Sequence, residues 1–167
     1  MARAPRVPQD GPSIFDFDAP QPAEPSSQRK LIVEADGGSR GNPGPSAYGA
    51  LVRDETEAVL DSEGLGLGIA TNNFAEYSGL IAALEMARGI DPSAEVEVRM
   101  DSKLVVEQSA GRWKIKHPDL KPLALRVQAL RPAKVTWIWI PREQNKAADA
   151  LVNAALDGKP KTRSTGA

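Results

Sequence analysis

An apolar run and a second short run with the pattern of a strand each lead into an aspartate in this chain. Residues 31–35 lead into Asp36, and residues 96–100 lead into Asp101. Apolar runs of this length, bounded by polar residues or glycine, are typical of buried strands. A helical pattern starts just after the second run, at Leu104. The pattern therefore favours an α/β fold in which strands alternate with helices and two strands end on an acid.

The rest of the chain divides into further strands and helices by the spacing of its apolar residues. Strands are expected at residues 30–35, 47–53 and 58–65, forming a meander, and at 96–100 and 134–140. Helices are expected at residues 73–89, 104–108, 120–130 and 145–156. Trp137 and Trp139, two apart in the last strand, are predicted to face the core. The Gly-Leu alternation at 64–68 is interpreted as a flexible strand exit.

The chain is long enough for one domain with a core, flanked by tails. Residues 1–28 are rich in Pro, Gln, Ser and Ala, which predicts a flexible Pro-rich tail. The domain is expected to cover residues 29–157. Residues 158–167 combine three basic side chains with little apolar content and are predicted to be a flexible basic tail.

Composition excludes several kinds of site. The chain has no cysteine and one histidine, His117, so disulfides, thiolate metal sites and multi-histidine sites are excluded. No apolar run approaches the roughly 20 residues that a membrane span needs, and no secretory leader pattern is present. We expect a cytoplasmic monomer whose metal ligands, if it has any, are oxygens.

The net charge of −1 hides an uneven distribution. Residues 31–98 carry 3 basic and 12 acidic residues, whereas residues 99–146 carry 11 basic and 4 acidic residues. The basic part could meet a polyanion while the acidic part presents metal ligands. Two differently charged solvated faces would give the same counts, so charge alone leaves both interpretations open.

Four acids stand where they could converge on one site: Asp36, Glu76, Asp101 and Asp149. The two aspartates at strand ends would lie side by side if the strands are parallel neighbours, because open α/β sheets place their sites at that edge. Glu76 and Asp149 would come from flanking helices, and divalent cations would relieve the mutual repulsion. Two Mg²⁺ ions about 4 Å apart suit phosphodiester hydrolysis. Singly, each acid is equally consistent with a surface charge or a helix cap.

In their order and spacing these motifs resemble type 1 ribonuclease H. They are the glycine-rich stretch that starts at Asp36 (residues 36–45), residues 71–73 with Glu76, Asp101-Ser102, and residues 145–149. The resemblance covers about residues 30–156. It implies a mixed five-stranded sheet flanked by helices and endonucleolytic cleavage of the RNA strand of RNA/DNA hybrids, leaving 5′-phosphate and 3′-hydroxyl ends.

The resemblance also implies roles for individual residues. Asp36 would bridge two Mg²⁺ ions, for which Mn²⁺ could substitute, with Glu76 and Asp101 completing one ion and Asp149 the other. Contact with the ribose 2′-hydroxyl, which distinguishes RNA from DNA, would involve Glu76. The positions expected near the RNA strand are Gly38, Ser39, Asn42 and Asn73. A DNA phosphate would be held by Asn42 and Thr71.

The chain departs from the best-known bacterial members of that family in two places. Those members have a flexible histidine in the loop before the last catalytic aspartate, where this chain offers Arg142. An arginine stays protonated, so it would hold phosphate or help expel product instead of carrying a proton. No long basic protrusion follows the helix after Asp101, and residues 111–118 leave Trp113 and Lys114 as candidate contacts to sugar and phosphate.

Two other functions are compatible with the same motifs. One is a related nuclease that also cuts double-stranded RNA. The other is a noncatalytic module that binds hybrids, as would result from loss of one of the four acids. The chain retains all four acids, which argues against the binding module.

Overall fold

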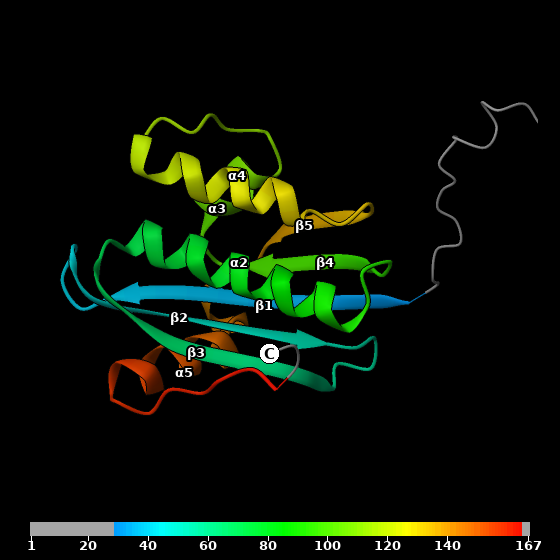
Figure 1. The fold of residues 1–167 in the computed structure, drawn as a ribbon, viewed down its shortest axis with the longest axis horizontal. Coiled ribbons are helices and arrows are strands. Elements are labelled where there is room, and N and C mark those ends of the chain that lie inside the picture. Colours follow the sequence, from blue (N-terminus) through cyan, green and yellow to red (C-terminus); the bar gives the residue numbers. More distant parts are fainter. Residues whose placement is uncertain (1–28, 165–167) are drawn as a thin grey trace, which may run out of the picture.

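The computed structural model describes residues 29–164, and the predicted Pro-rich tail at 1–28 lies outside the described residues. Within these residues three consecutive strands come first, and helices then alternate with the last two strands (Figure 1). The strands are β1 (Lys30–Ser39), β2 (Gly44–Arg53), β3 (Val59–Ala70), β4 (Glu95–Met100) and β5 (Val135–Trp139). The helices are α2 (Asn72–Ile90), α3 (Lys103–Ser109), α4 (Lys121–Leu130) and α5 (Lys146–Leu156), with short 3₁₀ turns η2 (Pro118–Leu120) and η3 (Arg142–Gln144).

The strands form one mixed sheet in the order β3-β2-β1-β4-β5. The first three strands are an antiparallel meander, whereas β1, β4 and β5 are parallel. Both the α/β class and the five-stranded mixed sheet predicted from the sequence are thus confirmed. In the pairing of β1 with β4, Ala35 lies opposite Met100. The aspartates that follow, Asp36 and Asp101, therefore stand beside each other at one edge of the sheet.

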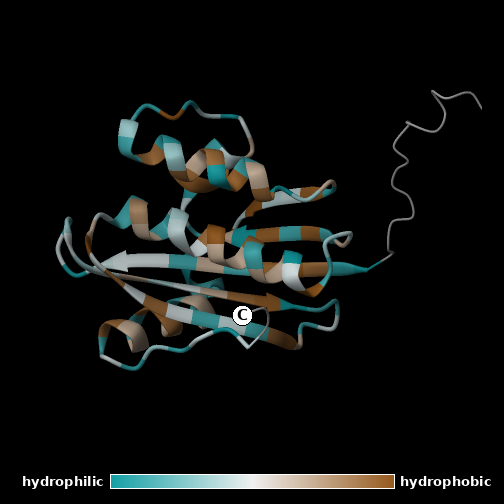
Figure 2. Ribbon diagram, viewed as in Figure 1, coloured by the Kyte–Doolittle hydropathy of each residue, from teal (hydrophilic) through white to brown (hydrophobic). Residues whose placement is uncertain are grey.

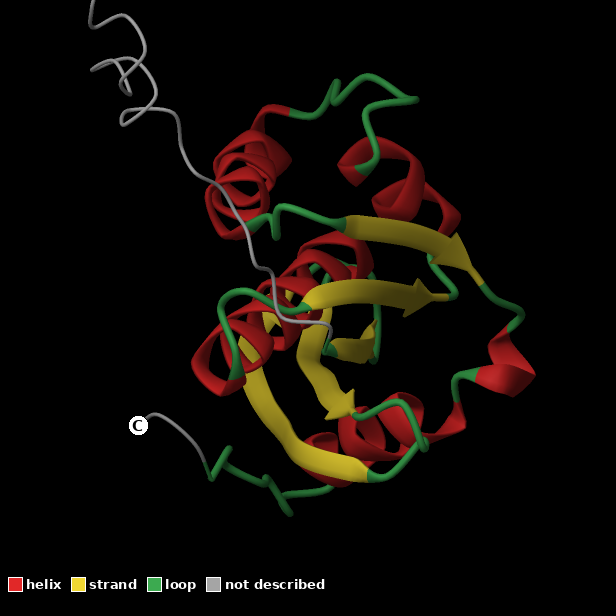
Figure 3. Ribbon diagram, turned by 90° about the vertical axis from the view of Figure 1, so that its right-hand side faces the viewer, coloured by secondary structure: helices red, strands yellow, loops and turns green. Residues whose placement is uncertain are grey.

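Helices cover both faces of the sheet (Figures 1 and 3). On one face α2 lies across β1 and β2, with α3 and α4 beside it, and on the other face α5 packs against β2, β3 and β1. The main core lies under α2, where apolar residues of the strands meet apolar residues of the helices (Figure 2). Burying one such leucine, for example Leu80 at 0% exposure, stabilises the fold by about 1.5–3 kcal/mol.

The alternation along β1 separates core from site. Leu31, Val33 and Ala35 belong to the core cluster. The intervening residues Glu34 and Asp36 point to the opposite face, because successive side chains of a strand alternate. The strand that carries the first acid of the site is thus held in place by burial of its other face.

Two predictions were wrong, one about β3, at the edge of the sheet, and one about the segment that follows α5. The Gly-Leu alternation at 64–68 lies inside β3, which pairs with β2 as far as Ala70, and so is not a flexible strand exit. The segment after α5, predicted to be a flexible tail, instead lies against β3 as far as Ser164. Lys161 forms a β-bridge with Gly64, and the Arg163 guanidinium pairs with the Glu63 carboxylate at 2.6 Å. Polar contacts hold this segment, which explains why its low apolar content was misleading.

The prediction for the two tryptophans holds for one of them. Trp137 is partly buried and packs against the core cluster. Trp139, in contrast, is 45% exposed at the edge of the sheet. Its indole Nε1 donates to the backbone oxygen of Asp101 at 3.1 Å, and the Lys103 ammonium lies 5.7 Å from its ring centroid. The second tryptophan therefore covers the strand end that carries Asp101.

Candidate active site

The acids predicted to converge do line one cavity. Its volume is about 430 Å³, and its walls include Asp36, Glu76, Asp101 and Asp149. One carboxylate oxygen from each of the first three lies within 4.8 Å of the others. Asp36 is the innermost of the aspartates and is 6% exposed. The expected convergence at the ends of parallel strands is therefore present in the structure.

A glycine places Glu76 next to Asp36. A Cβ atom on Gly37 would lie 2.2 Å from the backbone carbon of Ala75 and 2.3 Å from the backbone nitrogen of Glu76, so α2 rests directly on β1 there. The Gly37 amide donates to Asp36 Oδ1 at 2.9 Å and to Glu76 Oε1 at 3.1 Å. One backbone N–H thus orients two of the carboxylates.

A second glycine brings α5 close to the other face. A Cβ atom on Gly49, the partner of Asp36 in β2, would lie 2.4 Å from the carbonyl oxygen of Ala148. The close contact places Asp149 near the carboxyl ends of β1 and β4, where Asp36 and Asp101 lie. Asn153 Nδ2 donates to Asp149 Oδ2 at 3.3 Å. Two helices on opposite faces therefore deliver their acids to the two aspartates of the strands.

The acids repel one another in the absence of a cation. Burial and, to a smaller extent, the neighbouring carboxylates of Asp101 and Asp149 raise the pKa of Asp36 to about 7, although the hydrogen bond from Gly37 lowers it. Burial, Asp36 and Asp101 likewise hold the pKa of Glu76 well above its usual range. A cation bound in the cavity would lower the pKa of both Asp36 and Glu76. An all-oxygen set of ligands, three of them within 4.8 Å of each other, fits Mg²⁺ or Mn²⁺.

Two arginines line this cavity. Arg40 pairs with Asp157 at 2.9 Å, whereas Arg142 lies on η3. Its side chain is 80% exposed, and Nη2 lies 3.9 Å from Asp149 Oδ1. At that distance and exposure the pair is weak, so the guanidinium is free to turn towards another anion. Arg142 therefore lines the same cavity as the four acids, and its predicted role stays a prediction.

Gly38 and Ser39, predicted near the RNA strand, line the same cavity as the acids. The Ser39 amide donates to Asn72 Oδ1 at 2.9 Å, and its hydroxyl donates to the carbonyl oxygen of Ala70 at 3.0 Å. These contacts tie the end of β1 to the start of α2.

The predicted phosphate contacts line an adjacent cavity of about 620 Å³ that includes Asn42, Thr71 and Asn73. Thr71 is the N-cap of α2, and its hydroxyl accepts from the Phe74 amide at 3.1 Å. Asn42 Oδ1 accepts from the Asn72 amide at 3.0 Å. Both side chains therefore also stabilise the helix start, whose N-terminal amides favour anions.

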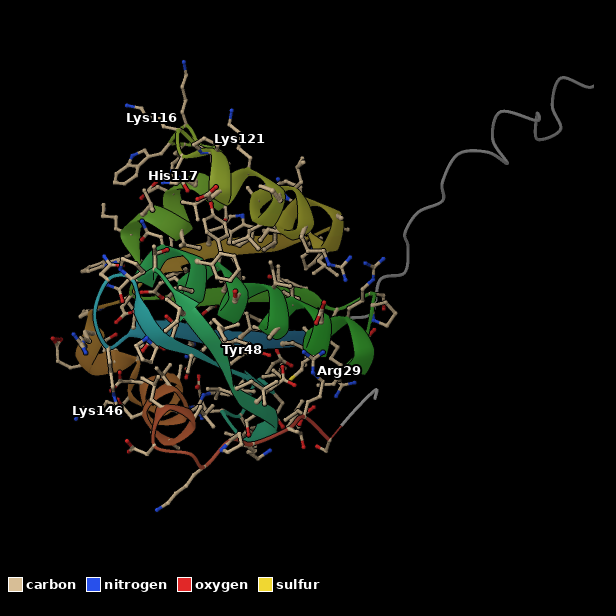
Figure 4. All side chains as sticks on the ribbon, turned by 60° about the vertical axis from the view of Figure 1, so that its left-hand side comes forward. Arg29, Tyr48, Lys116, His117, Lys121 and Lys146 are labelled. Atoms are coloured by element: carbon tan, nitrogen blue, oxygen red, sulfur yellow. The ribbon has the colours of Figure 1, made fainter. Side chains whose placement is uncertain are left out.

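Trp113 and Lys114 line a third cavity of about 520 Å³, which shares Asn73 with the second. Trp113 is 45% exposed. Figure 4 shows the basic side chains Lys116 and Lys121 projecting with His117 from this end of the molecule, away from Lys146. The three cavities are neighbours around the start of α2: the second and third share Asn73, His117 and Leu120, and the acid cavity includes the adjacent Asn72.

Sequence reasoning missed three residues that build the site: Gly37, Gly49 and Asn145. The two glycines lie within strands, and a glycine inside a strand pattern is a known sign of close backbone approach. Asn145 precedes a helix, where an asparagine is normally interpreted as a cap. Its side chain instead points to Asp101, with Nδ2 at 3.3 Å from Asp101 Oδ1.

A mixed sheet with helices on both faces and acids at the ends of its parallel strands defines the ribonuclease H-like class of protein. Comparison with known proteins agrees: the family described as reverse transcriptase-like matches residues 34–155. Ribonuclease HI of Halobacterium salinarum is 41% identical over 138 residues, which cover 80% of this chain and 68% of that protein. The chain therefore belongs to the type 1 ribonuclease H family.

Further relatives show the same relationship. Bifunctional protein Rv2228c of Mycobacterium tuberculosis is 51% identical over 131 residues, covering 77% of this chain but 36% of the relative, so the chain spans about a third of its length. The N-terminal RNase H domain of that protein superimposes with a TM-score of 0.75 at 50% identity, covering 78% of this chain and 96% of the domain structure. LC11-RNase H1, solved in complex with an RNA/DNA hybrid, gives a TM-score of 0.73 at 41% identity, covering 77% and 97%.

Proposed function

We propose that this protein is an endoribonuclease that hydrolyses the RNA strand of RNA/DNA hybrids. The observation that carries the proposal is the cavity in which Asp36, Glu76 and Asp101 bring three carboxylate oxygens within 4.8 Å of one another, with Asp149 in its wall. Membership of the type 1 ribonuclease H family supports it, as does a 41% identical relative solved with an RNA/DNA hybrid.

Two divalent ions, Mg²⁺ or Mn²⁺, would be held by the four acids. Asp36, the most buried of the three aspartates, would bind both ions, as the resemblance to type 1 ribonuclease H implies. Glu76 and Asp101 would complete one ion and Asp149 the other. Such a pair supplies activation of the attacking water and stabilisation of the leaving oxygen.

The bond changes follow from the proposed products. Water oxygen forms a bond to phosphorus, the bond from phosphorus to the 3′-oxygen breaks, and that oxygen takes up a proton, which leaves 5′-phosphate and 3′-hydroxyl ends. The chain contributes positioning: Gly37 orients Asp36 and Glu76 through its amide, and Arg142 at the rim would hold the scissile phosphate or help expel product. Glu76 and the backbone at Gly38 and Ser39 would contact the RNA strand, where the 2′-hydroxyl is the group that distinguishes it from DNA.

The DNA strand would follow the second and third cavities. Asn42 and Thr71, beside the α2 N-terminus, would hold a phosphate, and Trp113 and Lys114 would contact a sugar and a further phosphate. Asn73, which lines both cavities, would instead contact the RNA strand. None of the helices within residues 29–164 is long and apolar enough to cross a membrane. Monomeric state and cytoplasmic location stay predictions.

A substrate panel tests the proposal. Hybrid, double-stranded RNA and double-stranded DNA of one sequence are incubated with the wild type and with Asp36→Asn, in Mg²⁺, in Mn²⁺ and in EDTA. We expect cleavage of the hybrid alone, dependent on metal and lost in the variant. Cleavage of double-stranded RNA as well would favour the broader nuclease, and binding of hybrid without cleavage in either metal would favour the noncatalytic module.

A further inference from the structure

Asn145 occupies the residue before α5, where an asparagine side chain would normally cap the helix by accepting from a backbone amide of the first turn. The side chain makes no such hydrogen bond. It is instead completely buried, at 0% exposure. The helix start therefore does not account for the asparagine at this position.

The amide group of Asn145 is directed at the acid cluster. Nδ2 donates to the carbonyl oxygen of Ala35 at 2.9 Å and to Asp101 Oδ1 at 3.3 Å. Because the Ala35 carbonyl can only accept, the NH₂ group and not Oδ1 must face these partners. Its two hydrogens are thus divided between the residue that precedes Asp36 and the carboxylate of Asp101.

The backbone of Asn145 continues the link. Its amide donates to the carbonyl oxygen of Arg142 at 2.9 Å, and its carbonyl oxygen accepts from the Asp149 amide at 3.1 Å. One residue therefore contacts the end of β1, the acid after β4, and the first turn of α5 that carries Asp149. It is a direct link between the strand acids and the acid of α5.

The remaining polar atom, Asn145 Oδ1, is buried and has no hydrogen-bond partner among the described residues. A buried acceptor without a partner is unfavourable, and an apolar side chain at this position would avoid that penalty. Packing alone therefore does not explain an asparagine at this position. Its NH₂ group, which donates to Asp101, would hold the Asp101 carboxylate in one rotamer.

We propose that Asn145 is a positioning residue: it fixes the Asp101 carboxylate and ties α5 to β1, so that the acids are arranged for divalent cations before a cation binds. This inference rests on the proposed function in that it assumes a metal role for the acids. Partners that orient a metal-ligating carboxylate typically change metal affinity or activity by roughly 10- to 100-fold when they are removed.

The test compares Asn145→Ala and the isosteric Asn145→Asp with Tyr48→Phe. Tyr48 is the matched control because it also makes a buried hydrogen bond, from its hydroxyl to Glu63 Oε1 at 2.6 Å, but does not line the acid cavity. The first readout needs no nucleic acid: the rise in melting temperature of each protein as Mg²⁺ is titrated. The second is kcat and KM for hybrid as a function of Mg²⁺ concentration.

We expect Asn145→Ala to need roughly 10- to 100-fold more Mg²⁺ for half of the melting-temperature rise and for half-maximal kcat, with KM for hybrid little changed. Asn145→Asp, which turns the donor into a third carboxylate facing Asp101, should show the larger effect. Tyr48→Phe should lose stability but keep the wild-type Mg²⁺ midpoint. If Asn145→Ala loses stability with an unchanged Mg²⁺ midpoint, as the control does, the role is structural and the inference is overturned.

The two proposals fail in different ways. A wild type that does not cleave hybrid, but whose Mg²⁺ response depends on Asn145, would refute the function and leave the positioning role standing. If neither Asn145 variant folds, the side-chain NH₂ resonances of Asn145 in the ¹⁵N-labelled wild type give the answer. They should be protected from exchange and should shift as Mg²⁺ is added, and signals that ignore Mg²⁺ would overturn the inference.

Discussion

The backbone of Ala75 lies so close to Gly37 that a Cβ atom on the glycine would be 2.2 Å from the carbon of Ala75. This contact sets the distance between β1 and α2 at the level of the acids. It explains how a helix residue, Glu76, reaches the same backbone amide as the strand residue Asp36. The geometry of the site thus depends on a residue with no side chain.

Gly37→Ala should therefore displace α2 and reduce both stability and activity. Overpacking of this kind typically costs about 1–3 kcal/mol, and the loss of kcat should exceed what the remaining folded fraction explains. Urea unfolding and hybrid cleavage measure the two effects. Gly89→Ala in the same helix is the control, because a Cβ there meets nothing within 4 Å and alanine favours the helix by about 1 kcal/mol. Equal behaviour of the two variants would contradict the close-packing account.

Neutralising the most buried aspartate should stabilise the metal-free protein. Asp36→Asn removes one charge from a cluster in which neighbouring carboxylates repel each other, so its melting temperature in EDTA should exceed that of the wild type. Added Mg²⁺ should raise the melting temperature of the wild type and much less that of the variant. Glu55→Gln, an exposed acid outside the cavity, should change neither value. A variant less stable than wild type in EDTA would argue against repulsion as the dominant effect.

The contact between the C-terminal segment and β3 should contribute to stability in a pH-dependent manner. Burial alone would raise the pKa of Glu63, but hydrogen bonds from Arg163 and Tyr48 hold it below its ordinary value of 4.5. Because the folded pKa is depressed, the stabilisation is present above pH 4.5 and is lost as the pH falls through the lower folded value.

Arg163→Gln should thus be less stable than wild type at pH 7, and the difference should shrink below pH 4.5. The variant leaves the buried Glu63 carboxylate with the Tyr48 hydroxyl but without its charged partner, a loss that typically costs about 1–3 kcal/mol. Urea unfolding across pH measures this, with the exposed Lys159→Gln as control. A difference that stays constant from pH 7 to pH 3 would show that the ion pair is not its source.

Lys114 should contribute to hybrid affinity through a phosphate contact. In an Asp36→Asn background, Lys114→Ala should weaken hybrid binding and reduce the slope of log Kd against log salt by about 0.9, the value for one phosphate contact. Lys134→Ala, an exposed lysine before β5, is the control of equal charge. An unchanged salt slope for the Lys114 variant would place the nucleic acid elsewhere.

Much of the fold could be predicted from the spacing of apolar residues and from turn-forming residues. The placement of Asp36 and Asp101 could be predicted because each follows a run with the pattern of a strand, and β1 and β4 are indeed parallel neighbours. The role of Asn145 could not, because an asparagine before a helix fits a cap as well as an inward-pointing donor, and only the tertiary structure distinguishes them.

The C-terminal segment was mispredicted for a related reason. Its partners, Asp61 and Glu63, lie about 100 residues away in the chain, so local composition carries no sign of them. Trp139 was mispredicted because period-two spacing identifies a face of a strand, but β5 is the last strand of the sheet and part of its face has no helix above it. Local sequence patterns therefore do not predict long-range polar contacts or the exposure of residues at the edge of a sheet.

The proposed activity is tested most directly by determining which strand of a hybrid is cleaved. A hybrid labelled on both strands is incubated with wild-type protein and Mg²⁺, and the ends of the fragments are determined. We expect internal cuts in the RNA strand alone, with 5′-phosphate and 3′-hydroxyl ends, and none with Asp36→Asn. Cleavage of the DNA strand, or an intact hybrid under both Mg²⁺ and Mn²⁺, would contradict it.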